Sequence, residues 1–250
     1  KSLSKNFKLN IIAEEAKSKI SNKLIIKNIS INSKSIKKND VFFAIKGKKR
    51  DGNKYVSEAF KKKSSLVILN RFDKNYPLSK QIKVKNSLSF LTKCSSIFRE
   101  NINAKIISIT GSCGKTTLKE MIGFTLKKIS KTTYSPKSFN NKYGVPLSLF
   151  NLKEKDEFGV FEVGMDKKGE INNLTKIIRP NLGIITNISY AHSKNFKNIN
   201  QIADAKAEMI NNIKKGGTIV LNMDDNFFNY HKKLALKEKL KIISFSITNK

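Results

Sequence analysis

The chain is poor in several residue types, and each shortage excludes a class of protein. Tryptophan is absent, and the 250 residues include only four prolines and two cysteines. The cysteines, Cys94 and Cys113, provide neither a disulfide framework nor a metal-binding spacing. No apolar run approaches the roughly 20 residues that cross a bilayer, and the first residues lack the apolar core of a secretion signal. We therefore expect a cytoplasmic protein without membrane insertion.

Acidic residues and arginines are also scarce. The sequence has 19 acidic against 50 basic residues, a formal net charge of +31, and all the basic residues except Arg50, Arg71, Arg99 and Arg179 are lysines. Arginine is the residue best suited to recognising bases and to binding phosphates with two hydrogen bonds. The lysines, moreover, are spread along the whole chain and do not cluster on one segment. We interpret the charge as a solvated surface that attracts anionic ligands, and expect no nucleic-acid partner. A basic nucleic-acid-binding module is the alternative, which salt-dependent DNA binding without ATP affinity would favour.

The first part of the chain mixes short elements. We expect a helix over residues 11–20, strands over 41–45 and 65–69, and a glycine-containing loop followed by a helix between those strands. Another helix is expected over 87–99. We place a domain boundary near Lys85, which gives a small α/β domain over residues 1–84 and a larger domain over 85–250.

From Lys105 onward, short apolar runs alternate with helical patterns, which predicts βαβ units and a mostly parallel, doubly wound sheet covered on both faces. The expected strands are residues 105–110, 159–163, 182–186, 218–222 and 241–245, and the expected helices are 115–129, 169–178, 199–213 and 226–236.

The sharpest motif is ITGSCGKTT, in which an apolar strand runs into a glycine loop and then a helix. Glycines let backbone N–H groups close around phosphate oxygens, and the helix N-terminus favours negative charge. Lys115 would contact the β- and γ-phosphates and Thr116 would bind Mg²⁺. The spacing G-x-x-G-K-T-T is shorter than the general phosphate-loop pattern, which has a glycine where this chain has Ile109. The nucleotide-binding loop is Gly111, Ser112, Cys113, Gly114, Lys115, Thr116 and Thr117.

Two further candidates follow predicted strands. Glu162 ends the strand GVFEV, and an acid at the carboxyl end of a strand beside a phosphate loop is placed to bind Mg²⁺. His192 comes after the next strand, in TNISYAH, at the same sheet edge. We interpret His192 as a metal or phosphate ligand, with a purely structural histidine as the alternative. His231, in a polar helix, is expected at the surface.

Lys206 lies in the helical segment QIADAKAEMI. A surface lysine is the default expectation for a helix. A lysine buried among apolar neighbours, however, has a lowered pKa and can be chemically modified or reactive. The apolar neighbours at helical spacing are Ile202, Ala203, Ala205, Met209 and Ile210.

With these residues assembled, the chain resembles the Mur ligases of peptidoglycan synthesis over nearly its whole length. The shorter phosphate loop is the family's, and so are FNNKYGVPLSLF, TNISYAH, ADAKAE and LNMDDN. FEVGMDKKGEI is similar to the E-x-G-(A/M)-x-x-x-G-E-I stretch of the branch that adds D-alanyl-D-alanine. The front segment is similar to a UDP-sugar-binding domain, with Ser33-Lys34 standing where the family has a serine-arginine pair.

The resemblance implies ATP and Mg²⁺ as cofactors. Lys115 and Thr116 would hold the ATP phosphates and Mg²⁺, with Glu162 as a further metal ligand. His192 would serve a second Mg²⁺. Lys206 would be the family's carbamylated lysine, with its new carboxylate bridging toward that metal. Catalytic roles therefore fall on Lys115, His192 and Lys206.

The resemblance also implies the substrates. Asn140 and Asn141 would approach the γ-phosphate and the substrate, and Asn222 with Asp225 the nucleoside. The implied reaction phosphorylates the terminal carboxylate of UDP-N-acetylmuramoyl-tripeptide, and the amine of D-alanyl-D-alanine then attacks the acyl phosphate. We expect a monomer.

The family has a third, C-terminal domain, and this chain ends at Lys250 and begins with lysine, so we expect a fragment of the longer enzyme. The enzyme alternatives are a UDP-N-acetylmuramoyl-dipeptide ligase or a folylpolyglutamate synthase, against which the GEI stretch and the front domain argue. A degenerate, non-catalytic relative is disfavoured by the intact phosphate loop with Glu162, His192 and Lys206.

Overall fold

The computed structural model describes residues 7–18, 24–47, 50–190 and 195–248. The chain divides into two compact units, one ending at Asn101 and the other beginning at Ile102. His192 lies outside the described residues, so its predicted role is neither placed nor tested.

The first unit is built on a parallel sheet with strand order β1-β2-β3-β4. The central strands are apolar runs that are buried throughout, as expected of parallel strands covered on both faces. The strands are β1 (Ile29–Ser30), β2 (Val41–Phe43), β3 (Leu66–Leu69) and β4 (Gln81–Lys83).

The helices of this unit are α1 (Phe7–Glu15), α2 (Val56–Lys61) and α3 (Ser87–Glu100). The expected helix over 11–20 was shifted in sequence: α1 begins earlier, with the Phe7 ring against Phe98 of α3, and ends before Lys17, whose φ of 51° is left-handed. Because α3 packs on α1 and β2, the units divide after this helix. The boundary predicted near Lys85 lies before it.

The second unit holds six parallel strands in the order β10-β9-β8-β5-β7-β6. Five of them lie where the apolar runs predict them, within one residue at each end. The three-residue strand β6 was not predicted, since TTY is too short and polar to stand out. The strands are β5 (Lys105–Thr110), β6 (Thr132–Tyr134), β7 (Phe158–Glu162), β8 (Leu182–Ile185), β9 (Thr218–Asn222) and β10 (Lys241–Phe245).

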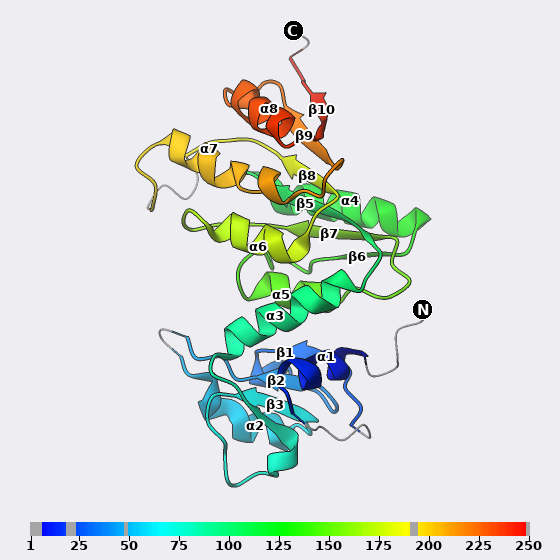
Figure 1. Cartoon of the computed structure of the whole chain (residues 1–250), viewed down its shortest axis with the longest axis vertical. Coiled ribbons are helices and arrows are strands. Elements are labelled where there is room, and N and C mark those ends of the chain that lie inside the picture. The colour runs from blue at the N-terminus through cyan, green and yellow to red at the C-terminus, as the bar shows by residue number, and fades with distance from the viewer. Residues whose placement is uncertain (1–6, 19–23, 48–49, 191–194, 249–250) are drawn as a thin grey trace. The chain divides into compact units, whose positions relative to one another are not determined.

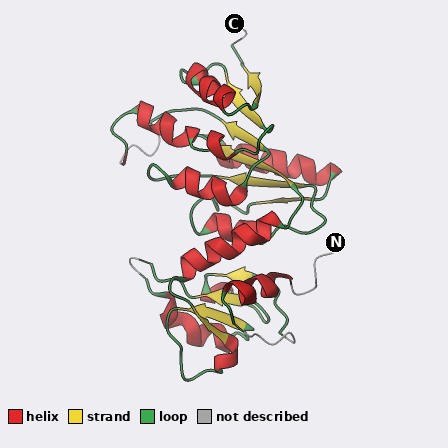
Figure 2. Ribbon diagram, viewed as in Figure 1, coloured by secondary structure: helices red, strands yellow, loops and turns green. Residues whose placement is uncertain are grey.

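Helices cover both faces of this sheet (Figure 1). The chain crosses from β5 toward β6 in one direction and from β7 through β8 to β10 in the other, so right-handed crossovers place α4 on one face and α6, α7 and α8 on the other. The mostly parallel, doubly wound sheet is thereby confirmed, and Figure 2 shows the alternation of helix and strand. The helices are α4 (Lys115–Ile129), α5 (Gly144–Leu149), α6 (Glu170–Ile178), α7 (Ile199–Ala207) and α8 (Phe228–Lys237).

The helix expected over 199–213 stops at Ala207, and a short 3₁₀ turn, η5 (Ile210–Asn212), follows it. Within the described part of the chain, none of the helices has the length and apolar character needed to traverse a bilayer.

Candidate functional site

The site is built where four parallel strands end side by side. In the sheet register, Ile109 of β5 pairs with Glu162 of β7, and Thr110 pairs with Ile185 of β8. Ile185 in turn pairs with Leu221 of β9. The phosphate loop after β5, Glu162 at the end of β7 and the turns after β8 and β9 therefore share one edge, which is where open parallel sheets bind ligands.

The phosphate loop connects β5 directly to α4, as predicted. Its two glycines have positive φ angles, 146° at Gly111 and 77° at Gly114, and Gly114 is the N-cap of α4. At Gly111 a side chain would also collide with the Thr186 hydroxyl. The glycines are thus required by the backbone path, which turns the loop's N–H groups and the helix N-terminus toward this edge.

The segment after β8, residues 186–189, forms a clamp on the phosphate loop through hydrogen bonds. The Asn187 carbonyl accepts from the Ser112 N–H at 2.9 Å, and the Asn187 side chain accepts from the Cys113 N–H at 3.0 Å. The Ser112 hydroxyl donates to the Ser189 carbonyl, and the Thr186 hydroxyl donates to the Cys113 carbonyl at 2.7 Å. Sequence reasoning missed this clamp, because it joins residues more than 70 positions apart.

Lys115 lies over the phosphate loop that precedes it. Its ammonium donates to the carbonyls of Gly111 at 2.7 Å and Ser112 at 3.0 Å. Burial lowers the pKa of this lysine, an effect opposed by the nearby Glu162 and Cys113. The ammonium rests on two backbone carbonyl oxygens and remains able to pair with phosphate oxygens.

Glu162 is confirmed beside the loop and is only 1% exposed. Its Oε2 accepts from the Thr116 hydroxyl at 2.7 Å, and its Oε1 accepts from the Asn140 side-chain amide at 2.7 Å. Both partners are neutral. Thr116, Asn140 and Glu162, predicted separately from the sequence, are therefore brought together in one cluster.

Lys206 reaches the same loop from α7. The side chain is 2% exposed, and its ammonium donates to the Gly111 carbonyl at 2.9 Å. Burial, with a smaller contribution from the charge of Lys115, lowers the pKa of Lys206 to about 7, while Cys113 opposes the shift. The default expectation of a surface lysine is therefore wrong, and the alternative of a buried lysine with a lowered pKa holds.

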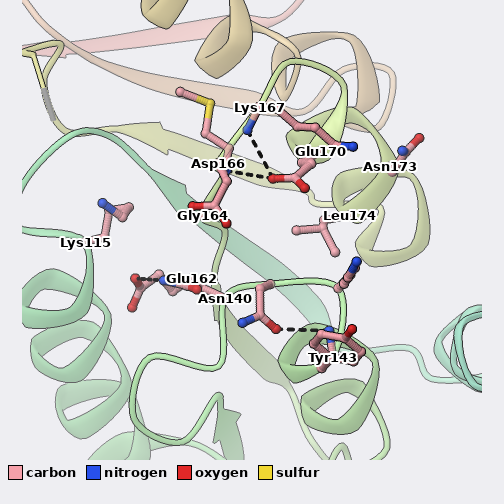
Figure 3. A pocket seen from close by; sticks show the side chains of 13 residues that line it. Lys115, Asn140, Tyr143, Glu162, Gly164, Asp166, Lys167, Glu170, Asn173 and Leu174 are labelled. Carbon is pink, nitrogen blue, oxygen red and sulfur yellow. Dashed lines mark hydrogen bonds between the residues drawn. The ribbon is translucent and has the colours of Figure 1, made fainter. Parts of the chain in front are cut away.

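A cavity of about 500 Å³ opens beside these groups. Lys115, Asn140 and Glu162 line one side of it, and residues of α6 and of the loop before α6 line the other (Figure 3). Asn141 also lines it, and its side-chain oxygen accepts from the N–H groups of Tyr143 and Gly144 at the start of α5. The remaining lining residues are Lys142, Tyr143, Gly164, Met165, Asp166, Lys167, Glu170, Asn173 and Leu174.

Asn222 and Asp225 lie at the same edge, where their side chains form hydrogen bonds with backbone groups of neighbouring segments. The Asp225 carboxylate accepts from the N–H groups of Ile188 at 2.6 Å and Phe227 at 2.8 Å. The Asn222 amide donates weakly to the Thr186 carbonyl at 3.5 Å. These contacts support the clamp on the phosphate loop; the predicted nucleoside role of the two residues stays a prediction.

The expectation of a surface position for His231 was wrong. This histidine is 2% exposed, its Nε2 lies 3.3 Å from the Ala203 carbonyl of α7, and burial lowers its pKa. The side chain falls on the inward face of α8, four residues before the fully buried Ala235.

In the first unit, the predicted substrate residues behave differently from each other. Ser33 is buried and its hydroxyl donates to Glu58 Oε2 at 2.7 Å, whereas Lys34 is exposed. The ammonium of Lys62 donates hydrogen bonds to the backbone carbonyls of both residues. Lys34 is therefore the side chain of this pair that is free to reach a ligand.

The residues present fit Mg²⁺. No group of three or more His, Cys, Asp and Glu side chains that could hold a metal occurs in the described ranges. Mg²⁺, however, is commonly bound by one or two protein oxygens together with water and substrate phosphates. The buried Glu162 carboxylate and the Thr116 hydroxyl beside it supply such oxygens.

Strand, glycine loop, helix and buried acid at one edge of a parallel sheet define a P-loop nucleotide-binding protein. The family comparison is more specific. Residues 109–250 match the Mur ligase middle domain, and residues 25–99 match the catalytic domain of the Mur ligase family. The chain belongs to the Mur ligase family.

Among curated proteins, the chain is 37% identical over 223 residues to UDP-N-acetylmuramoyl-tripeptide--D-alanyl-D-alanine ligase of Rickettsia prowazekii, covering 89% of this chain and 49% of that protein. A crystal structure of MurF from Acinetobacter baumannii has a TM-score of 0.85 at 29% identity, over 94% of this chain and 52% of that one. MurF ligase from Thermotoga maritima in complex with ADP has a TM-score of 0.76 at 28% identity, over 90% and 52%. The chain thus spans about half the length of these relatives.

Proposed function

We propose that the chain is the nucleotide-binding part of an ATP-dependent ligase that joins D-alanyl-D-alanine to UDP-N-acetylmuramoyl-tripeptide in peptidoglycan precursor synthesis. The observation that carries the proposal is the cluster of Lys115, Thr116 and Glu162 on a phosphate loop of the family's short form. The names of the relatives support the substrate assignment, and the ADP complex of the Thermotoga maritima protein supports a nucleotide at this loop.

In the proposed reaction, a terminal carboxylate oxygen of the tripeptide attacks the γ-phosphorus of ATP, and the bond to the β-phosphate oxygen breaks, leaving ADP. The amine of D-alanyl-D-alanine then attacks the carbonyl carbon of the acyl phosphate. Inorganic phosphate leaves, the amine loses a proton, and an amide bond remains. Each step moves negative charge among oxygens, so catalysis depends on fixed positive charge and hydrogen-bond donors at the transferring group.

The residues of the site fit this chemistry. Lys115 would pair with the β- and γ-phosphate oxygens, and Thr116 and Glu162 would hold Mg²⁺, which neutralises phosphate charge when bound. Asn140 orients Glu162 in the structure. The cavity beside Lys115 is the proposed place for the acceptor carboxylate, because it is lined by the same Lys115, Asn140 and Glu162.

Lys206 is proposed to be carbamylated. In carbamylation a neutral amine attacks CO₂ and loses a proton, and the pKa of about 7 provides a neutral amine near neutral pH. The product is an anion, which is costly to bury alone but is stabilised beside Lys115 and a bound Mg²⁺.

For the first unit, we propose recognition of the UDP end of the substrate near Lys34. The support is the match to the family's domain over residues 25–99 and the exposure of Lys34. In NMR titration of the whole chain with UDP at millimolar concentration, signals around Lys34 should shift. Shifts confined to residues after Ile102 would count against this assignment.

The nucleotide proposal is tested by calorimetry. ATP with Mg²⁺ should bind, and Lys115→Ala should weaken binding by about 1–3 kcal/mol, the loss of a charged hydrogen-bond donor. Lys127→Ala, on an exposed position of the same helix, should leave the affinity unchanged. Equal binding by wild type and Lys115→Ala would refute the assigned loop.

A further inference from the structure

Lys119 is a buried cation for which the proposed reaction has no direct use. It lies on α4 one turn after Lys115, and its relative exposure is 0%. Its ammonium donates to the carbonyls of Ser135 at 2.8 Å and Lys137 at 2.7 Å, and contacts Glu120 Oε1 at 2.5 Å. Burying an ammonium is costly unless its donors are paired, and here each of its three protons has an acceptor.

The two carbonyls belong to a sharply bent segment, residues 135–140, which leads from β6 into the cavity. Lys137, at the bend, has a left-handed φ of 48°, which is uncommon for a residue other than glycine. The Phe139 N–H closes the turn onto the Pro136 carbonyl at 3.2 Å. The bend points the Ser135 and Lys137 carbonyls at a single ammonium, so this ion–dipole contact stabilises a conformation that is otherwise unfavourable.

The far end of this segment contacts the oxygen ligands proposed for Mg²⁺. The Asn140 side chain donates to Glu162 Oε1 at 2.7 Å, and the Asn140 carbonyl accepts from the Gly164 N–H at 2.8 Å. The Ser138 hydroxyl lies 3.5 Å from the Thr116 hydroxyl. Lys119 is therefore connected, through one short segment, to both Thr116 and Glu162.

We propose that Lys119 is a positioning residue: it fixes the bend at 135–140, so that Asn140 holds the Glu162 carboxylate facing Thr116 in the orientation that receives nucleotide-bound Mg²⁺. Lys119 itself touches neither nucleotide nor metal. The inference rests on the proposed binding of Mg²⁺ and ATP at this loop and assigns to Lys119 the metal-dependent part of that binding.

The test compares ATP affinity of the whole chain in EDTA and in excess Mg²⁺, both by calorimetry. Lys119→Met keeps the length of the side chain and removes the donors. Its affinity in EDTA, which depends on Lys115, should stay within about twofold of wild type. The gain in affinity caused by Mg²⁺ should fall on the order of tenfold, the equivalent of one lost hydrogen bond of about 1.4 kcal/mol. Lys119→Arg, which retains charge and donors, should restore part of this gain.

Lys127→Met is the matched control, because its ammonium, like that of Lys119, lies 6.0 Å from the Tyr134 ring centroid but is exposed. It should retain the full Mg²⁺ gain. A full gain in Lys119→Met, or an equal loss of affinity with and without Mg²⁺, would overturn the inference.

Two further outcomes of this experiment can be distinguished from those above. If circular dichroism shows that Lys119→Met does not fold, Asn140→Ala takes its place: it removes the last link of the same path and should lose the same Mg²⁺ gain, and a retained gain would overturn the inference. If wild type binds no ATP in either condition, the proposed function fails and this inference fails with it.

Discussion

The two units have the same architecture, a parallel sheet with helices, but the second gathers buried charged side chains around its phosphate loop. In the first unit, the Asp40 carboxylate is 3% exposed and accepts from the N–H groups of Asn28 and Lys37 and from the Asn28 amide. In the second, Lys119 and Lys206 are buried with their ammonium groups on backbone carbonyls. Asp40 closes a local loop through backbone N–H groups, as Asp156 does in the second unit. Lys206, by contrast, brings an amine to the edge that carries the phosphate loop.

The largest expected effect tests Lys206, at the edge that carries the phosphate loop, in the proposed ligase reaction. Lys206→Ala should lower ligase turnover by a factor on the order of 100 or more, since the proposed carbamate would help to bind the Mg²⁺ that neutralises charge at the transferring phosphoryl group. ATP binding through Lys115 should be largely retained, which calorimetry would check. Short carboxylic acids added to the variant should restore part of the activity. Near-normal turnover of the variant would show that Lys206 has only a structural role.

A second prediction concerns the backbone of the phosphate loop. Gly111→Ala should destabilise the second unit by about 2–4 kcal/mol, because its φ of 146° is strained for alanine and the new methyl meets Thr186. Gly114→Ala, which has a left-handed φ but open space around it, should cost about 1 kcal/mol. Urea unfolding of both variants would measure the difference, and equal costs would contradict the close approach of the two segments.

A third, smaller effect should stay within the first unit. Asp40→Ala leaves the N–H groups of Asn28 and Lys37 without their acceptor and should destabilise this unit by about 1–3 kcal/mol. ATP affinity should not change, because the hydrogen-bond partners of Asp40, Asn28 and Lys37, lie within the first unit. A loss of ATP affinity at temperatures where the variant remains folded would show that the two units are coupled.

The last prediction is a dependence of stability on pH, which is gradual because it is spread over several pH units. The pKa of Lys206 falls from its ordinary 10.5 to about 7 in the folded protein. Between these values the unfolded chain binds more protons than the folded one, so this lysine makes the free energy of unfolding rise as pH rises from about 7 to 10.5. Lys206→Met should remove that part of the slope in urea titrations, whereas the exposed Lys168→Met should not. Identical slopes would mean that Lys206 remains protonated in the fold.

Much of the second unit was predictable, because its signals are local. The run 105–110 has the apolar character of a buried strand, the glycines that follow have few conformational alternatives, and α4 begins directly at Lys115 as predicted. The position of Glu162 followed from the rule that parallel strands present their carboxyl ends at one edge. The motif sequences also resembled the family that the comparisons confirm.

What only the tertiary structure decided is which distant groups meet. The sequence determined the strands, the phosphate loop and the candidate residues, because hydrophobic periodicity and backbone requirements act over a few neighbouring positions. It did not distinguish Lys119 from the exposed lysines of the same helix, nor show His231 as buried, nor reveal the clamp of Asn187 on the phosphate loop. The burial of a side chain and its hydrogen-bond partners depend on which elements the sheet order brings together. The pKa of a lysine follows from that packing and not from its neighbours in sequence.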